Sequence, residues 1–216
     1  MTLSTSPHHR PVRILCLGDS YTIGEAVRPA DRFIYQLIRK AKHELNISFA
    51  RPQIIAQTGW TTDELWEQIQ ITELKSEYDF VTLLIGVNNQ YRGRSLTNYR
   101  REFLRLLTFG LEKSASPSGM SVLSIPDWGC TPFVSQDKKR RPPSRISKEI
   151  DAFNLINAEL ADSVGASYIN ITPSSRKALS DSSLTAKDGL HPSARMYSLW
   201  ADLLLKKWKP KLKKYA

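Results

Sequence analysis

Short unbroken runs of apolar residues alternate along the chain with longer segments in which apolar residues recur every three or four positions. The first pattern is typical of strands buried in a parallel sheet, and the second of helices with one buried face. Strands are predicted at residues 12–17, 52–56, 80–85, 121–125 and 166–171. Helices are predicted at residues 29–45, after a capping box at 61–64, at 96–111, at 146–164 and from 192 to 208.

Strands and helices that alternate at this spacing predict a parallel sheet with helices on both faces. Right-handed crossovers leave few topologies for such a sheet. The 216 residues suffice for one well-packed domain and are few for two. The sequence therefore predicts a single α/β domain over residues 1–216, with a flexible N-terminus at 1–11 and a basic C-terminal tail at 209–216. Residues 131–144 and 174–189 are expected to form irregular loops.

The composition is that of an ordinary globular protein, because 41% of the residues are hydrophobic and 24% are charged. No segment approaches the roughly 18 consecutive apolar residues of a membrane span, and the polar N-terminus lacks the apolar centre of a secretory signal. Both observations favour a cytoplasmic protein. Cys16, within the first apolar run, and Cys130, in a turn, are expected to be free thiols, although two cysteines also permit one disulfide.

The formal net charge is +10, and a strongly positive charge is typical of proteins that bind acidic partners such as nucleic acids or anionic membrane surfaces. The positive residues are concentrated at 138–141, in a proline-containing loop, and at 206–214, where a helix ends and cations are favoured by its dipole. Neither cluster has the interleaved aromatic residues of a nucleic-acid binder. We therefore expect both to be solvated surface, with no nucleic-acid partner.

A Gly-Asp-Ser turn directly follows the first predicted strand. It places Ser20 at the carboxyl end of a strand, where ligands and chemistry are found in parallel α/β sheets. A serine on a strand-to-helix turn is suited to act as a nucleophile. The same turn could instead hold a phosphate on its backbone N–H groups, or be a plain solvated turn. This stretch alone leaves the three interpretations open.

Polar residues also follow the next two predicted strands, at Gly59 and at Asn88–Asn89. Because the carboxyl ends of parallel strands share one edge of the sheet, these residues are expected to converge with Ser20. Each of them taken singly is an ordinary turn residue. Their agreement in position makes the combination more specific than its parts.

A carboxylate stands three residues ahead of a histidine just before the last predicted helix, at Asp188 and His191. This spacing brings an aspartate oxygen to the imidazole Nδ1, which fixes the tautomer and leaves Nε2 free to act as a base. Such a pair is as often a helix-capping arrangement. A serine hydroxyl, however, is a weak nucleophile near pH 7 without a base, so the pair gives Ser20 the partner that it needs.

These stretches resemble the SGNH, or GDSL-type, hydrolase family over nearly the whole chain. Residues 18–24 resemble the first block of the family, with Tyr21 where the four-letter name has leucine. Gly59 matches the glycine of the second block, residues 86–89 match the third, and residues 188–192 match the last. The third block usually ends in aspartate, and Asn89 stands there, which keeps hydrogen-bonding capacity but loses the charge.

The resemblance implies a three-layer α/β/α sandwich around a five-stranded parallel sheet, a flavodoxin-like arrangement. It also implies a serine hydrolase of carboxylic esters that needs no metal or organic cofactor. Ser20 would be the nucleophile, His191 the general base and then acid, and Asp188 its orienting partner. The backbone N–H groups of Ser20 and Gly59 and the side-chain amide of Asn88 would form the oxyanion hole.

The family includes lipases, lysophospholipases, thioesterases, arylesterases and carbohydrate acetylesterases, and the shape of the pocket decides among them. The segments expected to shape the pocket are Trp60, 90–94, 128–134 and 174–187, and their aromatic and aliphatic residues favour a small-molecule ester with a small or medium acyl group. The expected pocket residues are Trp60, Asn89 and Trp128. We interpret Asp19 as a structural acceptor for nearby backbone N–H groups.

Two alternatives from other functional classes remain. A flavodoxin-like module would use the first turn to bind the phosphate of a nucleotide or flavin. A structural interaction protein would use the basic loop and tail. Neither alternative explains why Asp188 and His191 occur together with Ser20.

Overall fold

The computed structural model describes residues 10–216, and its centre is a five-stranded parallel sheet. The strands are β1 (Ile14–Gly18), β2 (Gln53–Ala56), β3 (Phe80–Leu84), β4 (Met120–Leu123) and β5 (Ser167–Ile169). Their order is β2-β1-β3-β4-β5, so the chain crosses β1 between its second and third strands. In sheets of this order, ligands bind at the carboxyl ends beside that crossing. The predicted flavodoxin-like parallel sheet is confirmed.

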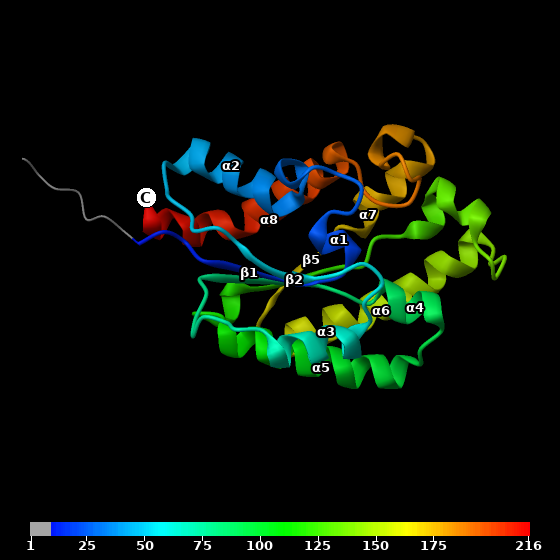
Figure 1. Cartoon of the computed structure of the whole chain (residues 1–216), viewed down its shortest axis with the longest axis horizontal. Helices are drawn as coiled ribbons and strands as arrows, with labels where there is room; N and C mark the ends of the chain where they lie inside the picture. The colour runs from blue at the N-terminus through cyan, green and yellow to red at the C-terminus, as the bar shows by residue number, and fades with distance from the viewer. Residues whose placement is uncertain (1–9) are drawn as a thin grey trace, which may run out of the picture.

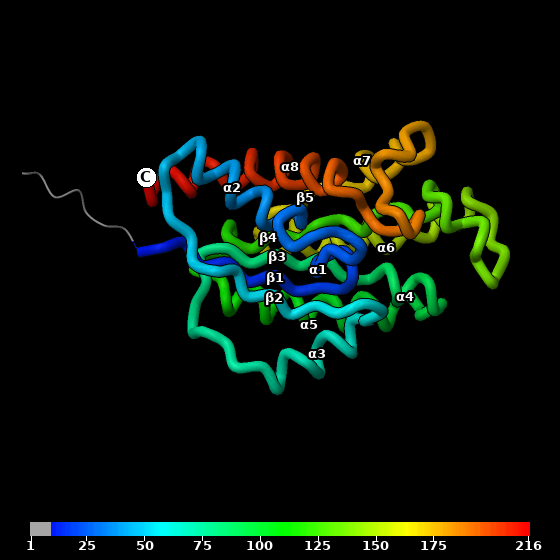
Figure 2. Tube along the Cα trace, turned by 45° about the horizontal axis from the view of Figure 1, so that its top comes forward, coloured from blue at the N-terminus to red at the C-terminus, as the bar shows by residue number. Residues whose placement is uncertain are grey.

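Helices cover both faces of the sheet and produce three layers (Figure 1). On one face α2 (Phe33–Leu45) packs along α8 (Ala194–Leu212), and Figure 2 shows the same pair on one side of the strands. The other face carries α3 (Thr62–Ile71), α5 (Leu96–Lys113) and α6 (Pro143–Ser163). Three short helices lie at the carboxyl end of the sheet: α1 (Ser20–Ile23), α4 (Val87–Arg92) and α7 (Thr172–Arg176).

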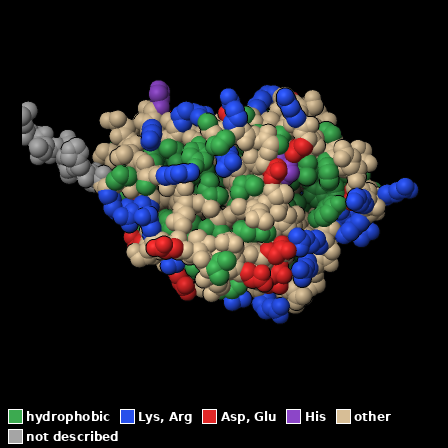
Figure 3. All heavy atoms as spheres, viewed as in Figure 1, with side chains coloured by type: hydrophobic (Ala, Val, Ile, Leu, Met, Phe, Trp, Pro, Cys, Tyr) green, Lys and Arg blue, Asp and Glu red, His purple; other side chains and the backbone are tan. Residues whose placement is uncertain are grey.

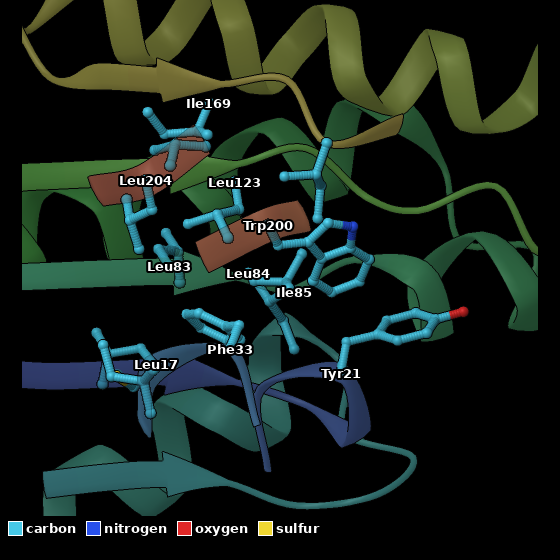
Figure 4. Close-up of a cluster of buried hydrophobic side chains, with 14 of the residues drawn as sticks. Leu17, Tyr21, Phe33, Leu83, Leu84, Ile85, Leu123, Ile169, Trp200 and Leu204 are labelled. Atoms are coloured by element: carbon cyan, nitrogen blue, oxygen red, sulfur yellow. The ribbon is translucent and has the colours of Figure 1, made fainter. Parts of the chain in front are cut away.

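The strands consist of apolar residues because both of their faces are covered. Every residue of β1 and of β3 is buried. Figure 4 shows Leu17, Leu83 and Leu123, from three neighbouring strands, beside Trp200 and Leu204 of α8, and all five are fully buried. Burial of each such side chain stabilises the fold by roughly 1.5–3 kcal/mol, so this contact fixes α8, and the loop before it, on the sheet.

The elements follow the predicted ranges to within a few residues, with differences that have local causes. The helix expected at 29–45 is interrupted at Arg32, whose extended backbone separates the 3-10 turn Pro29–Asp31 from α2. The segment at 131–144 is less irregular than expected, because it contains the 3-10 helix Pro132–Gln136 and because α6 already begins at Pro143. Residues 174–189 include the end of α7 and two further 3-10 turns.

The basic C-terminal segment packs on the body instead of forming a free tail. Helix α8 continues through Pro210 to Leu212, and the Tyr215 hydroxyl donates to Asp79 Oδ1 (2.6 Å). The buried Asp79 carboxylate also accepts two hydrogen bonds from the Arg10 guanidinium (2.7 and 2.8 Å). One carboxylate therefore fixes both ends of the described chain. Residues 1–9 of the predicted flexible N-terminus lie outside the described residues.

Cys16 and Cys130 are both buried free thiols, as the sequence predicts. Among residues 10–216, no helix is long enough and apolar enough to span a membrane. Figure 3 shows Lys and Arg side chains spread over the face seen in Figure 1, with hydrophobic side chains exposed between them both across the middle of the face and toward the end that carries α1 and α4.

Candidate active site

The turn between β1 and α1 presents Ser20 at the carboxyl end of the sheet. Gly18 ends β1 where no side chain fits, because a Cβ there would lie 2.1 Å from Thr22 Oγ1 and 2.3 Å from the Leu84 carbonyl oxygen. Asp19 then caps α1 by accepting a hydrogen bond from the Tyr21 N–H (3.0 Å). Ser20 is the first residue of α1 and lines a cavity at this end of the sheet.

The loop before α8 brings a histidine and an aspartate to the same cavity. Gly189 has a positive φ of 71°, which turns the chain so that Asp188 Oδ1 accepts from the N–H groups of Leu190 and His191 (3.0 Å each). Asp188 Oδ2 lies 2.6 Å from His191 Nδ1. A carboxylate oxygen accepts, so Nδ1 donates and Nε2 of the neutral ring is left as a base.

The Asp188 carboxyl is adapted to this role. Partial burial raises its pKa, but the hydrogen bonds from the imidazole and from the two backbone N–H groups outweigh burial and leave the pKa below its ordinary value. The group is therefore ionised near neutral pH, and a negative charge lies against the ring that would gain a proton during catalysis.

Contacts between α1 and α8 bring His191 near Ser20, although 171 positions separate them in the sequence. The Tyr21 ring meets the His191 ring edge-on, with centroids 5.7 Å apart, and the Tyr197 hydroxyl donates to the Tyr21 carbonyl oxygen (3.0 Å). Ser20 and His191 line one cavity, with no direct hydrogen bond between their side chains in the described structure. In enzymes without substrate such bonds are often long and shorten in the complex.

Three hydrogen-bond donors lie along the same cavity, at Ser20, Gly59 and Asn88. Gly59 follows β2 with a positive φ of 86°, and within residues 10–216 neither its N–H nor that of Ser20 donates to a protein acceptor. Asn88 Nδ2 donates to the Trp60 carbonyl oxygen (2.9 Å), which uses one of its two N–H bonds and leaves the other free. Such donors can stabilise the negative oxygen of a tetrahedral intermediate.

The cavity has a volume of about 200 Å³ and an apolar wall. That wall is formed by Val87, Tyr91, Trp128, Phe133 and Leu190. A serine, a histidine paired to a carboxylate, and converging donors beside an apolar cavity are the components of acyl transfer by a serine nucleophile.

The three residues expected in the pocket lie in three different places. Trp128 lines the cavity. Trp60 lines a separate cleft that adjoins the cavity through Thr58 and Gly59. The prediction that Asn89 lines the pocket is wrong. Its side chain is completely buried, accepts a hydrogen bond from the Thr62 N–H (3.1 Å) and donates one to the Thr62 hydroxyl (2.7 Å). Neighbouring residues of a helix face different directions, so Asn88 lines the cavity while Asn89 joins α4 to α3.

Tyr91 and Phe133 lie within segments 90–94 and 128–134, which the sequence predicts to shape the pocket, whereas Leu190 lies outside every predicted pocket segment. Tyr91 lies three positions after Asn88, which places both on one face of α4, but this signal requires α4 to be recognised as a helix. The sequence predicts a turn there, because the six residues of α4 are too few for a helical repeat to be visible. Phe133 lies in the 3-10 helix Pro132–Gln136 and Leu190 in the turn before α8, and neither carries a comparable periodic signal.

Asp19 leads to a prediction on stability. Burial raises its pKa to about 7 despite the hydrogen bond from the Tyr21 N–H, and within the described chain its Oδ2 has no hydrogen-bond partner. The unfolded pKa is about 3.9, so between these values the native state binds more protons, and the free energy of unfolding falls as the pH rises. We expect Asp19→Asn to remove most of this fall, measured as urea denaturation from about pH 4 to about pH 8. Parallel curves for both proteins would contradict the assignment.

Comparisons with known proteins add the family context. Residues 16–199 match the model of the GDSL-like lipase/acylhydrolase family. The structure resembles the lipase/acylhydrolase from Enterococcus faecalis at 20% identity, with a TM-score of 0.67 over 93% of this chain and 96% of the other. The acetylxylan esterase Axe2 from Geobacillus stearothermophilus matches at 15% identity, with a TM-score of 0.70 over 94% and 96%.

TesA matches at 14% identity, with a TM-score of 0.69 over 92% of this chain and 98% of the other. At these low identities, the TM-scores of the three structures show that they share the fold of this chain. A search of curated protein sequences finds no significant match.

Proposed function

The chain belongs to the GDSL-like lipase/acylhydrolase family, and on this premise we propose that it hydrolyses carboxylic esters with small or medium acyl groups through an acyl-enzyme on Ser20. The observation that carries the proposal is the pairing of His191 Nδ1 with Asp188 Oδ2 at 2.6 Å on the cavity that Ser20 lines. This pairing gives a serine at a strand end the base that it lacks as a plain turn residue.

In the proposed first step, His191 Nε2 takes the proton of Ser20 Oγ as that oxygen attacks the ester carbonyl carbon. The carbonyl oxygen becomes negative and accepts hydrogen bonds from the N–H groups of Ser20 and Gly59 and from Asn88 Nδ2. The C–O bond to the alcohol then breaks, and His191 returns its proton to the leaving oxygen. Asp188 stabilises the imidazolium throughout and stays ionised.

In the second step, water replaces the alcohol. His191 removes a proton from water as its oxygen attacks the acyl-serine carbonyl, and the same donors hold the oxyanion. Collapse breaks the bond to Ser20 Oγ, which regains its proton from His191. The products are a carboxylic acid and the regenerated serine, and no redox or metal chemistry enters these steps.

The size of the cavity supports the choice of acyl group. A volume of about 200 Å³, bounded by aromatic rings of Tyr91, Trp128 and Phe133, suits a chain of a few carbon atoms. Longer chains would have to displace these rings or extend into solvent.

A second candidate function is the removal of acetyl groups from a carbohydrate. The cleft beside the cavity measures about 500 Å³ and is lined by Trp60 together with polar side chains, namely Gln57, Glu64, Glu67, Gln68 and Arg92. A tryptophan presents an apolar face, and amide and carboxylate groups bind hydroxyls. The resemblance to an acetylxylan esterase fits this candidate.

A substrate panel tests both candidates. We expect purified protein to hydrolyse p-nitrophenyl acetate and butyrate with higher kcat/KM than the octanoate ester and lysophospholipid. A higher kcat/KM for an acetylated xylooligosaccharide than for p-nitrophenyl acetate would select the second candidate. Absence of hydrolysis of every ester in the panel would overturn the proposed function.

The donor role of Asn88 gives a further prediction. Asn88→Ala is expected to lower kcat for p-nitrophenyl acetate by about 10²–10³-fold, the effect of losing one oxyanion donor. Its hydrogen bond to Trp60 is worth only about 1 kcal/mol, so thermal unfolding should show a folded protein. Asn89→Ala is the matched control, because it removes a buried structural amide and should lower stability more than kcat. A kcat of Asn88→Ala within about threefold of the wild-type value would contradict the role of Asn88 as an oxyanion donor.

A further inference from the structure

A buried ion pair lies behind the aromatic wall of the cavity. The Arg141 side chain is 6% exposed and that of Asp137 is fully buried. Asp137 accepts hydrogen bonds from Arg141 Nε (3.0 Å), from its terminal nitrogen (3.2 Å) and from its backbone N–H (3.0 Å). These bonds lower the pKa of Asp137 to about 2. The expectation that residues 138–141 are solvated surface is therefore wrong for Arg141.

The Arg141 guanidinium packs on two rings that line the cavity. Its central carbon lies 5.0 Å from the ring centroids of both Tyr91 and Trp128, which meet each other edge-on at 5.6 Å. A cation is attracted to the face of an aromatic ring, and the attraction is stronger when the cation is shielded from water, as the buried Arg141 is. Arginine suits this position better than lysine, because its guanidinium is planar and weakly hydrated.

The same wall is held at its edges by hydrogen bonds. Trp128 Nε1 donates to Gln90 Oε1 (2.8 Å), and Gln90 Nε2 donates to Glu149 (2.6 Å). The Phe133 ring packs edge-on against Trp128, and the Phe133 N–H donates to the Gly189 carbonyl oxygen (3.0 Å). The wall is thus connected to the loop that carries Asp188 and His191.

A second cavity, of about 410 Å³, adjoins this wall through Gln90 and Arg141. It is lined by Gln90 and Arg141, with other polar residues and with apolar surface from Leu96, Ala152 and Phe153. Tyr91 and Trp128 line the first cavity, Gln90 and Arg141 line the second, and the two pairs are in contact. Arg141 is therefore part of the partition between the two spaces.

We propose that Arg141 is a positioning residue that sets acyl-chain selectivity, by holding Tyr91 and Trp128 as a partition that closes the acyl cavity to longer chains. The inference rests on the proposed function of that cavity as the acyl site. Without the guanidinium, the two rings lose the cation between them, and an acyl chain gains a path from the first cavity into the second.

The test compares Arg141→Ala with Arg145→Ala. Arg145 also lines the second cavity and also pairs with a carboxylate, Glu149, but among the described residues its guanidinium stacks on neither ring. Arg141→Ala is expected to raise the ratio of kcat/KM for the octanoate ester to that for the acetate ester by about tenfold or more. About tenfold is the lower limit of the discrimination in kcat/KM that one methylene gives in a hydrophobic pocket. Arg145→Ala should leave the ratio unchanged. If Arg141→Ala lowers kcat/KM by the same factor for every chain length, Arg141 has only a structural role and the inference is overturned.

Arg141→Ala also leaves the buried Asp137 without a partner, which is strongly destabilising. The double variant Asp137→Asn with Arg141→Ala removes both charges and should show the same change of selectivity in a folded protein. A double variant with the wild-type ratio overturns the inference.

Binding of octanoate provides a readout that does not depend on turnover. Both proteins carry Ser20→Ala, and binding of octanoate is measured by the change in tryptophan fluorescence. We expect the protein that also carries Asp137→Asn and Arg141→Ala to bind octanoate about tenfold more tightly than Ser20→Ala alone. Equal affinities would overturn the partition even if the protein were no esterase. Inactivity of the wild type on all esters would instead overturn the proposed function alone.

Discussion

Replacement of Ser20 by alanine is expected to lower kcat for p-nitrophenyl acetate by about 10⁴–10⁶-fold, the loss seen when the nucleophile of a serine hydrolase is removed. The variant has no oxygen at the start of α1 to attack the carbonyl, and His191 then has no proton to remove. Initial rates at saturating substrate measure the effect. The fold should persist, because Ser20 Oγ makes no hydrogen bond to another residue in the described structure.

Thr58→Ala is the matched control for this change. Thr58 also presents a hydroxyl to the cavity, but its side chain is paired with Glu25 and it stands outside the turn that follows β1. It should retain most of the wild-type kcat. Comparable losses in both variants, or residual activity of Ser20→Ala above about one hundredth of wild type, would remove Ser20 from the mechanism.

The second large effect is expected from Asp188→Asn, which should lower kcat by about 10⁴-fold. The asparagine oxygen can still accept from the N–H groups of Leu190 and His191, so the loop keeps its shape. Its amide, however, donates where Asp188 Oδ2 accepts from His191 Nδ1. The ring must then carry its proton on Nε2, and that nitrogen can no longer act as the base for Ser20.

Asp181→Asn controls for the loss of a capping carboxylate. Asp181 also accepts from a backbone N–H two residues on, at Ser183, and also pairs with a cation, Arg195, but in the described structure it makes no hydrogen bond with His191. Its kcat should stay near wild type. Nitrogen chemical shifts of the imidazole should report the other tautomer in Asp188→Asn alone. An unchanged tautomer together with a kcat within about tenfold of wild type would exclude the orienting role.

The parts of the site that lie at strand ends could be predicted from the sequence. Unbroken apolar runs mark β1, β2 and β3, and Ser20, Gly59 and Asn88 each follow one of them closely. A parallel sheet brings such positions to one edge without any knowledge of side-chain packing. The spacing of Asp188 and His191 was similarly local, because three positions and a glycine turn are enough to place a carboxylate on Nδ1.

The parts that depend on packing between distant segments could not be predicted. Asn89 is buried because α4 is a helix whose neighbouring face meets Thr62 of α3, 27 positions earlier. Arg141 belongs to a run of four basic residues that has the pattern of a solvated loop. Its burial depends on Asp137 and on rings at Tyr91 and Trp128, and no local periodicity reports such contacts.

The most direct test of the account is to identify the nucleophile by covalent labelling. The protein is incubated with a fluorophosphonate, digested and mapped by mass spectrometry, with the Asp188→Asn variant and Ser20→Ala as comparisons. The account predicts a single phosphonylated residue, Ser20, with slow labelling in Asp188→Asn and none in Ser20→Ala. An adduct on another residue, or hydrolysis of p-nitrophenyl acetate that continues with Ser20 fully labelled, would contradict it.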